Sequence, residues 1–310
     1  MKHSLTFIFA WVAALFVSQV SALALVAGDV IYVADANTGA IKQFNSAGQG
    51  SAFGSVGAVN PVGLAVDPAG NLFVANRSGG VSGTINRFTP GGSRTLFSSD
   101  MNFPSKLAFD AGGSLYAGMV GNNTIRKFNA LGQGTVFASS GADAPIPLAF
   151  DHGGNLYVGN LFANTITKFN SAGQPTVFAS SVNSPYGLAF DSGDNLFMAS
   201  FTDNTILKID PAGNSSVFAG LGSGINAPVD LAFDRSGNLF VLNLGNNTIL
   251  KFDQAGNGSL FANTGMDHPE SLAIRIVPEP AGGALFSAAG ALLLCRRRRR
   301  FKRSAVRATS

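Results

Sequence analysis

The sequence predicts an all-β fold built from one repeated sheet unit, and three observations lead to that prediction. Charged residues make up only 12% of the chain, against about 25% in typical soluble domains, and the 38 glycines favour turns over long helices. The region between residues 25 and 276 repeats with a spacing of 40 to 43 residues. Each repeat contains four short apolar runs separated by turn residues, which is typical of strands joined by hairpins.

An aspartate marks each repeat. The cleanest copy runs from Ser184 to Gly220, and its Asp191 recurs in four other copies, at Asp67, Asp110, Asp151 and Asp234. Segments such as Asp67 to Asn71 follow the pattern Asp-x-x-Gly-Asn. The Asp side chain can accept a hydrogen bond from the backbone two residues on, while the Gly takes a positive φ. The segment therefore predicts a tight hairpin between the first and second strands.

The four apolar runs predict the four strands of a meander. The first run is similar to Leu-Ala-Phe, at 64–66, 107–109, 148–150, 188–190 and 231–233. The second is similar to Leu-Phe-Val, at 72–74, 115–117, 156–158, 196–198 and 239–241. The third reads Thr-Ile-x-Lys-Phe, at 124–128, 165–169 and 248–252, and the fourth ends in Val-Phe, at 136–137, 177–178 and 217–218. One repeat is thus two hairpins in series.

Apolar residues occur on both faces of these strands, so a single sheet would leave one apolar face in water. Neighbouring sheets must cover both faces, which is the arrangement of a β-propeller. The 26 phenylalanines fall mostly at repeated strand positions. We interpret them as packing between blades rather than as a stacking platform for a ligand.

The ends of the repeat region predict how the ring closes. The chain starts with a second, a third and a fourth strand at 31–35, 41–44 and 51–53, and a spare first strand follows the last repeat at 269–274. The prediction is a six-bladed β-propeller of four-stranded antiparallel blades, over residues 25–276. The N- and C-terminal strands share one blade, in which Leu272 and Ile274 are buried and no long edge is exposed.

Residues 1–24 predict a signal peptide that forms an N-terminal signal helix. An apolar run from Leu5 to Val17 follows Lys2, and Ala22 and Ala24 form an Ala-x-Ala arrangement before the cut. A membrane anchor is the alternative. Its weakness is length, because a spanning helix needs about 20 apolar residues.

Residues 277–310 form a separate tail. After Pro278, Glu279 and Pro280 come an apolar stretch at 281–295 and a basic cluster that starts at Arg296. At 1.5 Å per residue the apolar stretch reaches about 22 Å, which predicts a short transmembrane helix that barely spans the bilayer. The basic cluster predicts that the tail is cytoplasmic and that the preceding domain lies outside.

The net charge of +4 comes from this tail, because residues 25–276 hold 12 basic and 16 acidic side chains. A nucleic-acid partner is therefore excluded, since a basic footprint should lie on the folded body. The single Cys295 excludes an intramolecular disulfide framework and a Cys-based zinc site.

The tail resembles the PEP-CTERM sorting signal of exopolysaccharide-producing Gram-negative bacteria, over about 34 residues that include Pro278, Glu279 and Pro280. The resemblance implies processing by an exosortase, a membrane Cys protease or transpeptidase. It also implies an exported protein, held transiently in the inner membrane and then located in the cell envelope or outside. A plain tail anchor is the alternative, because an apolar stretch before a basic cluster is also what topology alone requires.

The repeat resembles NHL-type and gluconolactonase-like six-bladed propellers. The shared pattern is Gly-Leu-Ala-Phe-Asp-x-x-Gly-Asn-Leu-Phe-Val-Ala-Asn, approximated at 187–200 and 63–76, and the resemblance covers nearly all of 29–276. It implies the fold more than an activity, because one fold hosts many functions. Lactonases of this kind hold a divalent metal at the central channel, and a similar lyase that inactivates streptogramins relies on His and Glu.

The candidate site lies at the channel mouth. The residues expected just before the first strands are Val62, Ser105, Ile146, Tyr186, Val229 and Glu270. Only Glu270 suits a hard cation such as Ca²⁺, with Asp230 displaced by one residue, so we assign no metal and no cofactor, and a Ca²⁺ site is the alternative. Lys106, Asp230, Glu270 and His268 are the candidate ligand-binding residues, with ordinary solvated loop charges as the alternative. No catalytic residue is assigned, and His152 is expected to be solvated in a hairpin turn.

The loops between second and third strands are rich in asparagine, at Asn122, Asn123, Asn164, Asn204, Asn246 and Asn247. Turn chemistry explains them, and contact with a polysaccharide is the sharper alternative.

The sequence therefore predicts an exported propeller of the cell surface or extracellular matrix that acts as a binding or scaffold module. Its expected partners are the exosortase during processing, and then surface polysaccharide or another envelope protein. The alternative is a metal-dependent, lactonase-like hydrolase or a lyase that uses the channel near Asp230, Glu270 and His268.

Overall fold

The computed structural model describes residues 29–57, 59–77 and 82–277, and residues 29–276 form one compact unit. The predicted signal helix, the short transmembrane helix and the motif from Pro278 to Pro280 lie outside the described residues. Within the described part of the chain, no helix is long and apolar enough to cross a membrane.

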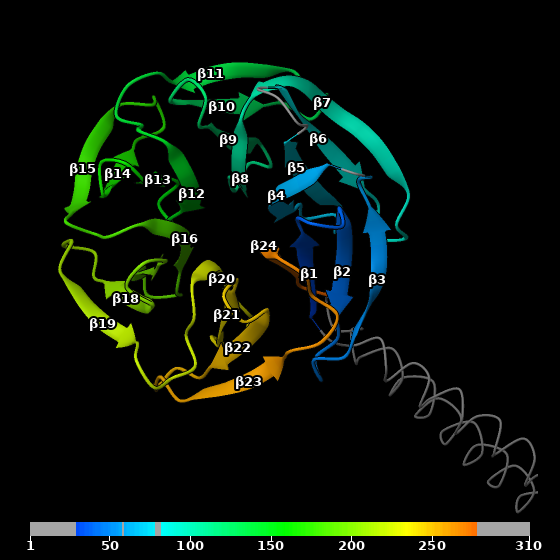
Figure 1. The fold of residues 1–310 in the computed structure, drawn as a ribbon. Helices are drawn as coiled ribbons and strands as arrows, with labels where there is room; N and C mark the ends of the chain where they lie inside the picture. Colours follow the sequence, from blue (N-terminus) through cyan, green and yellow to red (C-terminus); the bar gives the residue numbers. More distant parts are fainter. Residues whose placement is uncertain (1–28, 58, 78–81, 278–310) are drawn as a thin grey trace, which may run out of the picture. The chain divides into compact units, whose positions relative to one another are not determined.

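The described residues form 24 strands in six four-stranded antiparallel sheets arranged as a ring (Figure 1). This confirms the six-bladed propeller. The first strands lie innermost: β4 (Asn60–Val66), β8 (Pro104–Phe109), β12 (Pro145–Phe150), β16 (Pro185–Phe190), β20 (Pro228–Phe233) and β24 (Pro269–Arg275). The second strands are β5 (Leu72–Arg77), β9 (Leu115–Met119), β13 (Leu156–Asn160), β17 (Leu196–Ser200), β21 (Leu239–Asn243) and β1 (Val30–Asp35).

The outer half of each blade is a second hairpin. The third strands are β6 (Ser82–Phe88), β10 (Thr124–Phe128), β14 (Thr165–Phe169), β18 (Thr205–Ile209), β22 (Thr248–Phe252) and β2 (Ala40–Phe44). The fourth strands are β7 (Arg94–Asn102), β11 (Gly134–Ala138), β15 (Pro175–Ser180), β19 (Ser215–Ala219), β23 (Gly258–Ala262) and β3 (Gly50–Ser55).

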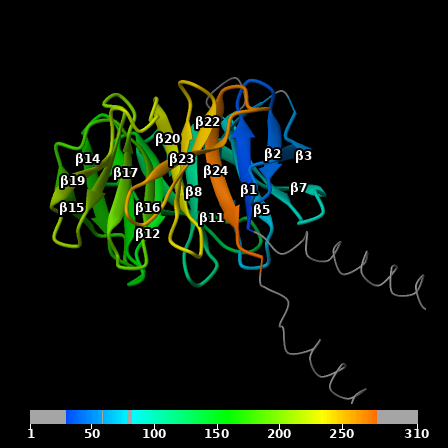
Figure 2. The same cartoon turned by 90° about the horizontal axis from the view of Figure 1, so that it is seen from below.

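The ring closes as the sequence predicted. One blade has the strand order β24-β1-β2-β3, so strands from both ends of the repeat region share a sheet, and Figure 2 shows β24 beside β1. Val33 pairs with Leu272 and Ile31 with Ile274. Leu272 is 4% exposed, in a cluster with Ile31 and Val33. We call this sheet the closing blade.

The first strands begin slightly earlier than expected. Each of the six has a proline at or next to its start, so Val62, Ser105 and their equivalents lie inside the strands rather than before them. Proline is tolerated at the start of a strand because its missing N–H is not needed there. The ladder shifts register just after the proline, as between Pro228 and Asp230.

The predicted turn between the first and second strands is confirmed, and in one blade an aspartate replaces its glycine. Asp67 Oδ1 accepts a hydrogen bond from the N–H of Asn71, four residues on, at 2.8 Å, and Gly70 has a φ of 81°. The same turn occurs in the other regular blades, and these turns define what we call the hairpin face of the ring. In the turn after β16, Asp194 takes the place of the glycine, with a φ of 57°.

Phenylalanine and tyrosine rings pack between blades, as interpreted from the sequence. Phe73 on β5 meets Phe109 on β8 of the next blade, with ring centroids 5.1 Å apart and an interplanar angle of 76°. Tyr157 and Phe190 repeat this edge-to-face contact two blades further round the ring, at 4.9 Å. Such pairs add about 0.5–1.5 kcal/mol beyond the area that they bury.

Candidate functional site

The first strands begin on the face opposite the hairpins, which we call the loop face because the loops between second and third strands also lie there. Two charged residues of the predicted site meet across the ring axis at this end. Lys106 on β8 and Asp230 on β20 come from opposite sides of the axis (Figure 1). Lys106 Nζ lies 3.0 Å from Asp230 Oδ2 and donates to the backbone carbonyl of Glu270. Only 8% and 11% of the two side chains are exposed.

The Asp230 carboxylate has further partners on the closing blade. Its Oδ2 accepts hydrogen bonds from Ser271 Oγ at 2.7 Å and from the N–H of Leu272 at 2.9 Å. Ser271 Oγ accepts in turn from the N–H of Leu64 at 3.1 Å. The buried charges are thus matched inside the protein, and Lys106 and Asp230 brace several blades against each other. Their role toward a ligand stays a prediction.

The other two predicted site residues, His268 and Glu270, lie beside this brace. His268 Nε2 is 3.5 Å from Glu270 Oε1, and the side chains are 47% and 23% exposed. His268 has a φ of 61° and directly precedes Pro269. Its N–H donates to Asn247 Oδ1 at 3.2 Å, which fixes the backbone from which the imidazole projects. The structure therefore brings all four predicted residues together at the loop face.

The sequence interpretation missed Arg77, at the end of β5. Its Nε donates to the carbonyl of Pro104 at 3.0 Å, and its guanidinium lies over the ring of Phe103, 5.4 Å from the centroid. Burial lowers the pKa of Arg77, while the charge of Glu270 acts in the opposite direction. Within the described part of the chain, Arg77 forms no ion pair. One signal could have found it: the equivalent position in the other blades is uncharged, at Ala36, Val120, Leu161, Phe201 and Leu244.

An aromatic pair completes the loop face. Tyr186 on β16 stacks on Phe201, with ring centroids 4.7 Å apart and an interplanar angle of 29°. Burial raises the pKa of Tyr186, with a further contribution from the charge of Glu270, while Arg77 lowers it. These couplings place Tyr186, Glu270 and Arg77, from three blades, within electrostatic reach of one another. Arg77 supplies a positive charge to this face, and the aromatic pair supplies an apolar surface.

The asparagines of the loops between second and third strands form hydrogen bonds within the protein. Those at the end of each loop have φ values of 52° to 55°, and each Oδ1 accepts from the backbone N–H that leads into the next blade. The acceptors and donors are Asn123 with Ala144 at 2.9 Å, Asn164 with Ser184 at 3.1 Å, Asn204 with Ala227 at 2.6 Å, and Asn247 with His268 at 3.2 Å. These amides latch neighbouring blades, which supports turn chemistry over ligand contact.

No metal centre is visible in the described ranges, because no three His, Cys, Asp or Glu residues there come together as ligands. Glu270 and Asp230, the carboxylates considered for Ca²⁺, are paired with His268 and Lys106 instead.

No model of a known protein family matches the chain, and no curated protein is a detectable sequence relative. Solved structures share its fold. A chain of a nidogen–laminin complex is 21% identical with a TM-score of 0.70, over 80% of this chain and 98% of that one. Virginiamycin B lyase from Staphylococcus aureus is 16% identical with a TM-score of 0.56, over 68% and 73%. A streptogramin B lyase is 13% identical with a TM-score of 0.59, over 79% and 91%. At these identities the likeness establishes the six-bladed fold and leaves the activity open.

Proposed function

We propose that this chain is an exported binding module whose loop face holds an acidic partner. The observation that carries the proposal is Arg77, a partly buried guanidinium without an ion pair in the described residues, within electrostatic reach of Tyr186, which stacks on Phe201. A planar guanidinium binds a carboxylate through two parallel hydrogen bonds. On the same face, Lys106 and Asp230 are matched to each other in a buried ion pair.

The partner that fits best is a surface polysaccharide that carries carboxylates, because a sugar ring can lie on the aromatic pair while its carboxylate meets Arg77. An envelope protein with an exposed Asp or Glu is the second partner class. The nidogen chain, which shares the fold, is found in a complex with laminin, which supports a binding role for this architecture. The resemblance of the repeat to NHL-type propellers fits the same role.

Replacement of Arg77 by Ala should weaken binding of an acidic polysaccharide such as alginate by at least tenfold. Arginine is a frequent hot spot, where truncation costs about 2 kcal/mol or more. Biolayer interferometry with immobilised alginate and with neutral dextran would measure the effect. Arg87→Ala, on β6, is the matched control and should bind normally. Equal alginate binding by wild type and Arg77→Ala would contradict the proposal.

The export part of the proposal depends on residues 277–310. Replacement of Glu279 by Gln should leave the full-length protein in the inner membrane, because the exosortase would no longer recognise the motif. Membrane fractionation and immunoblotting of cells that express the variant would detect the retained form. Normal release of this variant would count against processing at this motif and favour a plain tail anchor.

A lyase that acts at the same place is the second candidate. It is favoured by the imidazole of His268 near the Glu270 carboxylate, the residue types that the related lyase uses, and by the fold that the chain shares with virginiamycin B lyase. Incubation with acidic polysaccharide separates the two functions. A binding module leaves the polymer at full length, whereas loss of length that disappears in His268→Ala would establish the lyase.

A further inference from the structure

We propose a second site, for a neutral oligosaccharide, in the groove between the blade β16–β19 and the blade β20–β23. A cavity of about 460 Å³ lies there, within the usual range for small-molecule sites. Its lining includes the first hairpin turns of both blades, at Ser192 and Ser236, so it opens on the hairpin face. We call it the hairpin groove. It shares no residue with the loop face, so this proposal can be tested separately from the proposed binding of an acidic partner.

The walls of the hairpin groove are aromatic. Phe190, Phe197, Phe218 and Phe233 line it. The ring of Phe197 lies 5.0 Å, centroid to centroid, from the rings of both Phe218 and Phe233. The interplanar angles are 83° and 78°, so both contacts are edge-to-face. Phe190, Phe218 and Phe233 are only partly buried. A pyranose ring has one face made mainly of C–H groups, which packs on such rings, and this contact requires no charge on the ligand.

The rim of the groove is polar and close to neutral overall. It carries three carboxylates, two cationic side chains and one imidazole: Asp191, Asp234, Asp253, Lys208, Arg235 and His152. Gln254 and two serines add neutral donors and acceptors. A charged ligand would meet repulsion from one half of this rim. A neutral ligand with many hydroxyl groups can donate to the carboxylates and accept from the cations, so the rim selects hydroxyls over charge.

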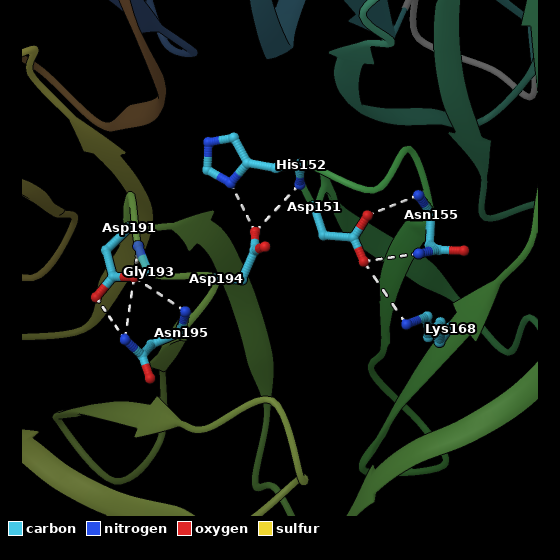
Figure 3. Close-up of polar contacts among 8 residues, drawn as sticks. All are labelled: Asp151, His152, Asn155, Lys168, Asp191, Gly193, Asp194 and Asn195. Carbon is cyan, nitrogen blue, oxygen red and sulfur yellow. Dashed lines mark hydrogen bonds and ion pairs between the residues drawn. The ribbon is translucent and has the colours of Figure 1, made fainter.

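An ion pair bridges the gap on each side of the hairpin groove. On one side, His152 Nδ1 lies 2.6 Å from Asp194 Oδ1 and joins the hairpin turns of two adjacent blades (Figure 3). On the other side, Arg235 Nη2 lies 2.9 Å from Asp29 Oδ1 and joins the blade β20–β23 to the closing blade. In both pairs the base is the second residue of one turn, and the acid lies just before the second strand of the next blade, two residues before β17 for Asp194 and one residue before β1 for Asp29.

At the hairpin groove the same two positions hold Ser192 and Gly237, which are too short to form a bridge. The bridges on either side depart from the repeat. Asp194 occupies a left-handed position that Gly70, Gly113 and Gly237 fill in other blades, where a side chain is disfavoured. Two contacts with His152 hold the Asp194 side chain in this position, and these hydrogen bonds lower the pKa of Asp194.

The chain itself supplies the test. Ser192→His combined with Gly237→Asp would copy the neighbouring bridge into the hairpin groove and close it. Ala111→His combined with Gly154→Asp would place the same pair between the blades β8–β11 and β12–β15, as a matched control. Maltotriose, cellotriose and laminaritriose are the probes, measured on the purified protein by saturation-transfer difference NMR and calorimetry.

We expect at least one trisaccharide to bind wild type and the matched control alike, and the closed variant at least tenfold more weakly. Gln254→Ala, an exposed rim substitution that should leave the fold intact, is expected to weaken binding at least threefold. Arg77→Ala should have no effect on these neutral probes. Absence of binding by all three sugars at millimolar concentration would overturn the proposal, as would unchanged binding in the closed variant and in Gln254→Ala.

Discussion

Replacement of Leu272 by Asp is expected to abolish cooperative unfolding of the propeller. Leu272 lies on β24, is 4% exposed and pairs with Val33 on β1, so it holds the closing blade together. Removing the buried Leu loses about 1.5–3 kcal/mol, and burial of an unpaired carboxylate adds several more. The sum is comparable to the total stability of about 5–15 kcal/mol for a native domain. Thermal melts followed by circular dichroism and calorimetry would measure the loss.

The matched control is Leu260→Asp, which makes the same change on the outer strand β23, where the side chain is 55% exposed. It should change the melting temperature little, because surface substitutions are usually within about 0.5 kcal/mol. If Leu272→Asp melts as cooperatively as Leu260→Asp, then the closing blade does not stabilise the ring, and strand exchange between the chain ends is unimportant for folding.

The fold could be predicted because its determinants are local and repeated. A turn such as Asp67 to Asn71 specifies its own hairpin through one carboxylate and one glycine, and the spacing of the aspartates counts the blades. The surplus strand around Leu272 then left one way to complete the ring. The starts of the first strands were less accurate, because the register shift after Pro228 and its equivalents depends on the neighbouring strand.

The site was less predictable, because it depends on contacts between distant blades. The sequence placed Lys106 and Asp230 at one end of the ring but could not show that they pair, since the two residues are three blades apart. Arg77 was missed because it ends a second strand, whereas the predicted site residues lie on first strands or directly before one. The partner of His152 was missed too: Asp194 stands where a glycine was expected, in the adjacent turn (Figure 3).

The buried pair of Lys106 and Asp230 leads to the second large effect. Lys106→Met keeps the length of the side chain but leaves the Asp230 carboxylate buried without its counter-ion. Asp230→Asn leaves the Lys106 ammonium in the same situation. Removal of one partner from a buried pair costs about 3–5 kcal/mol, which in a domain of this size lowers the melting temperature by roughly 6–20 °C. Each single variant should show that loss in calorimetry.

The double variant separates the brace from simple loss of packing. Lys106→Met with Asp230→Asn removes both charges, while the Asn oxygen can still accept from Ser271 Oγ and from the N–H of Leu272. Because no charge remains buried alone, the double variant should be more stable than either single one, and the coupling between the two sites should be large. If the stability losses of the two single variants simply add, then Lys106 and Asp230 do not interact. The ion pair would then not stabilise the loop face.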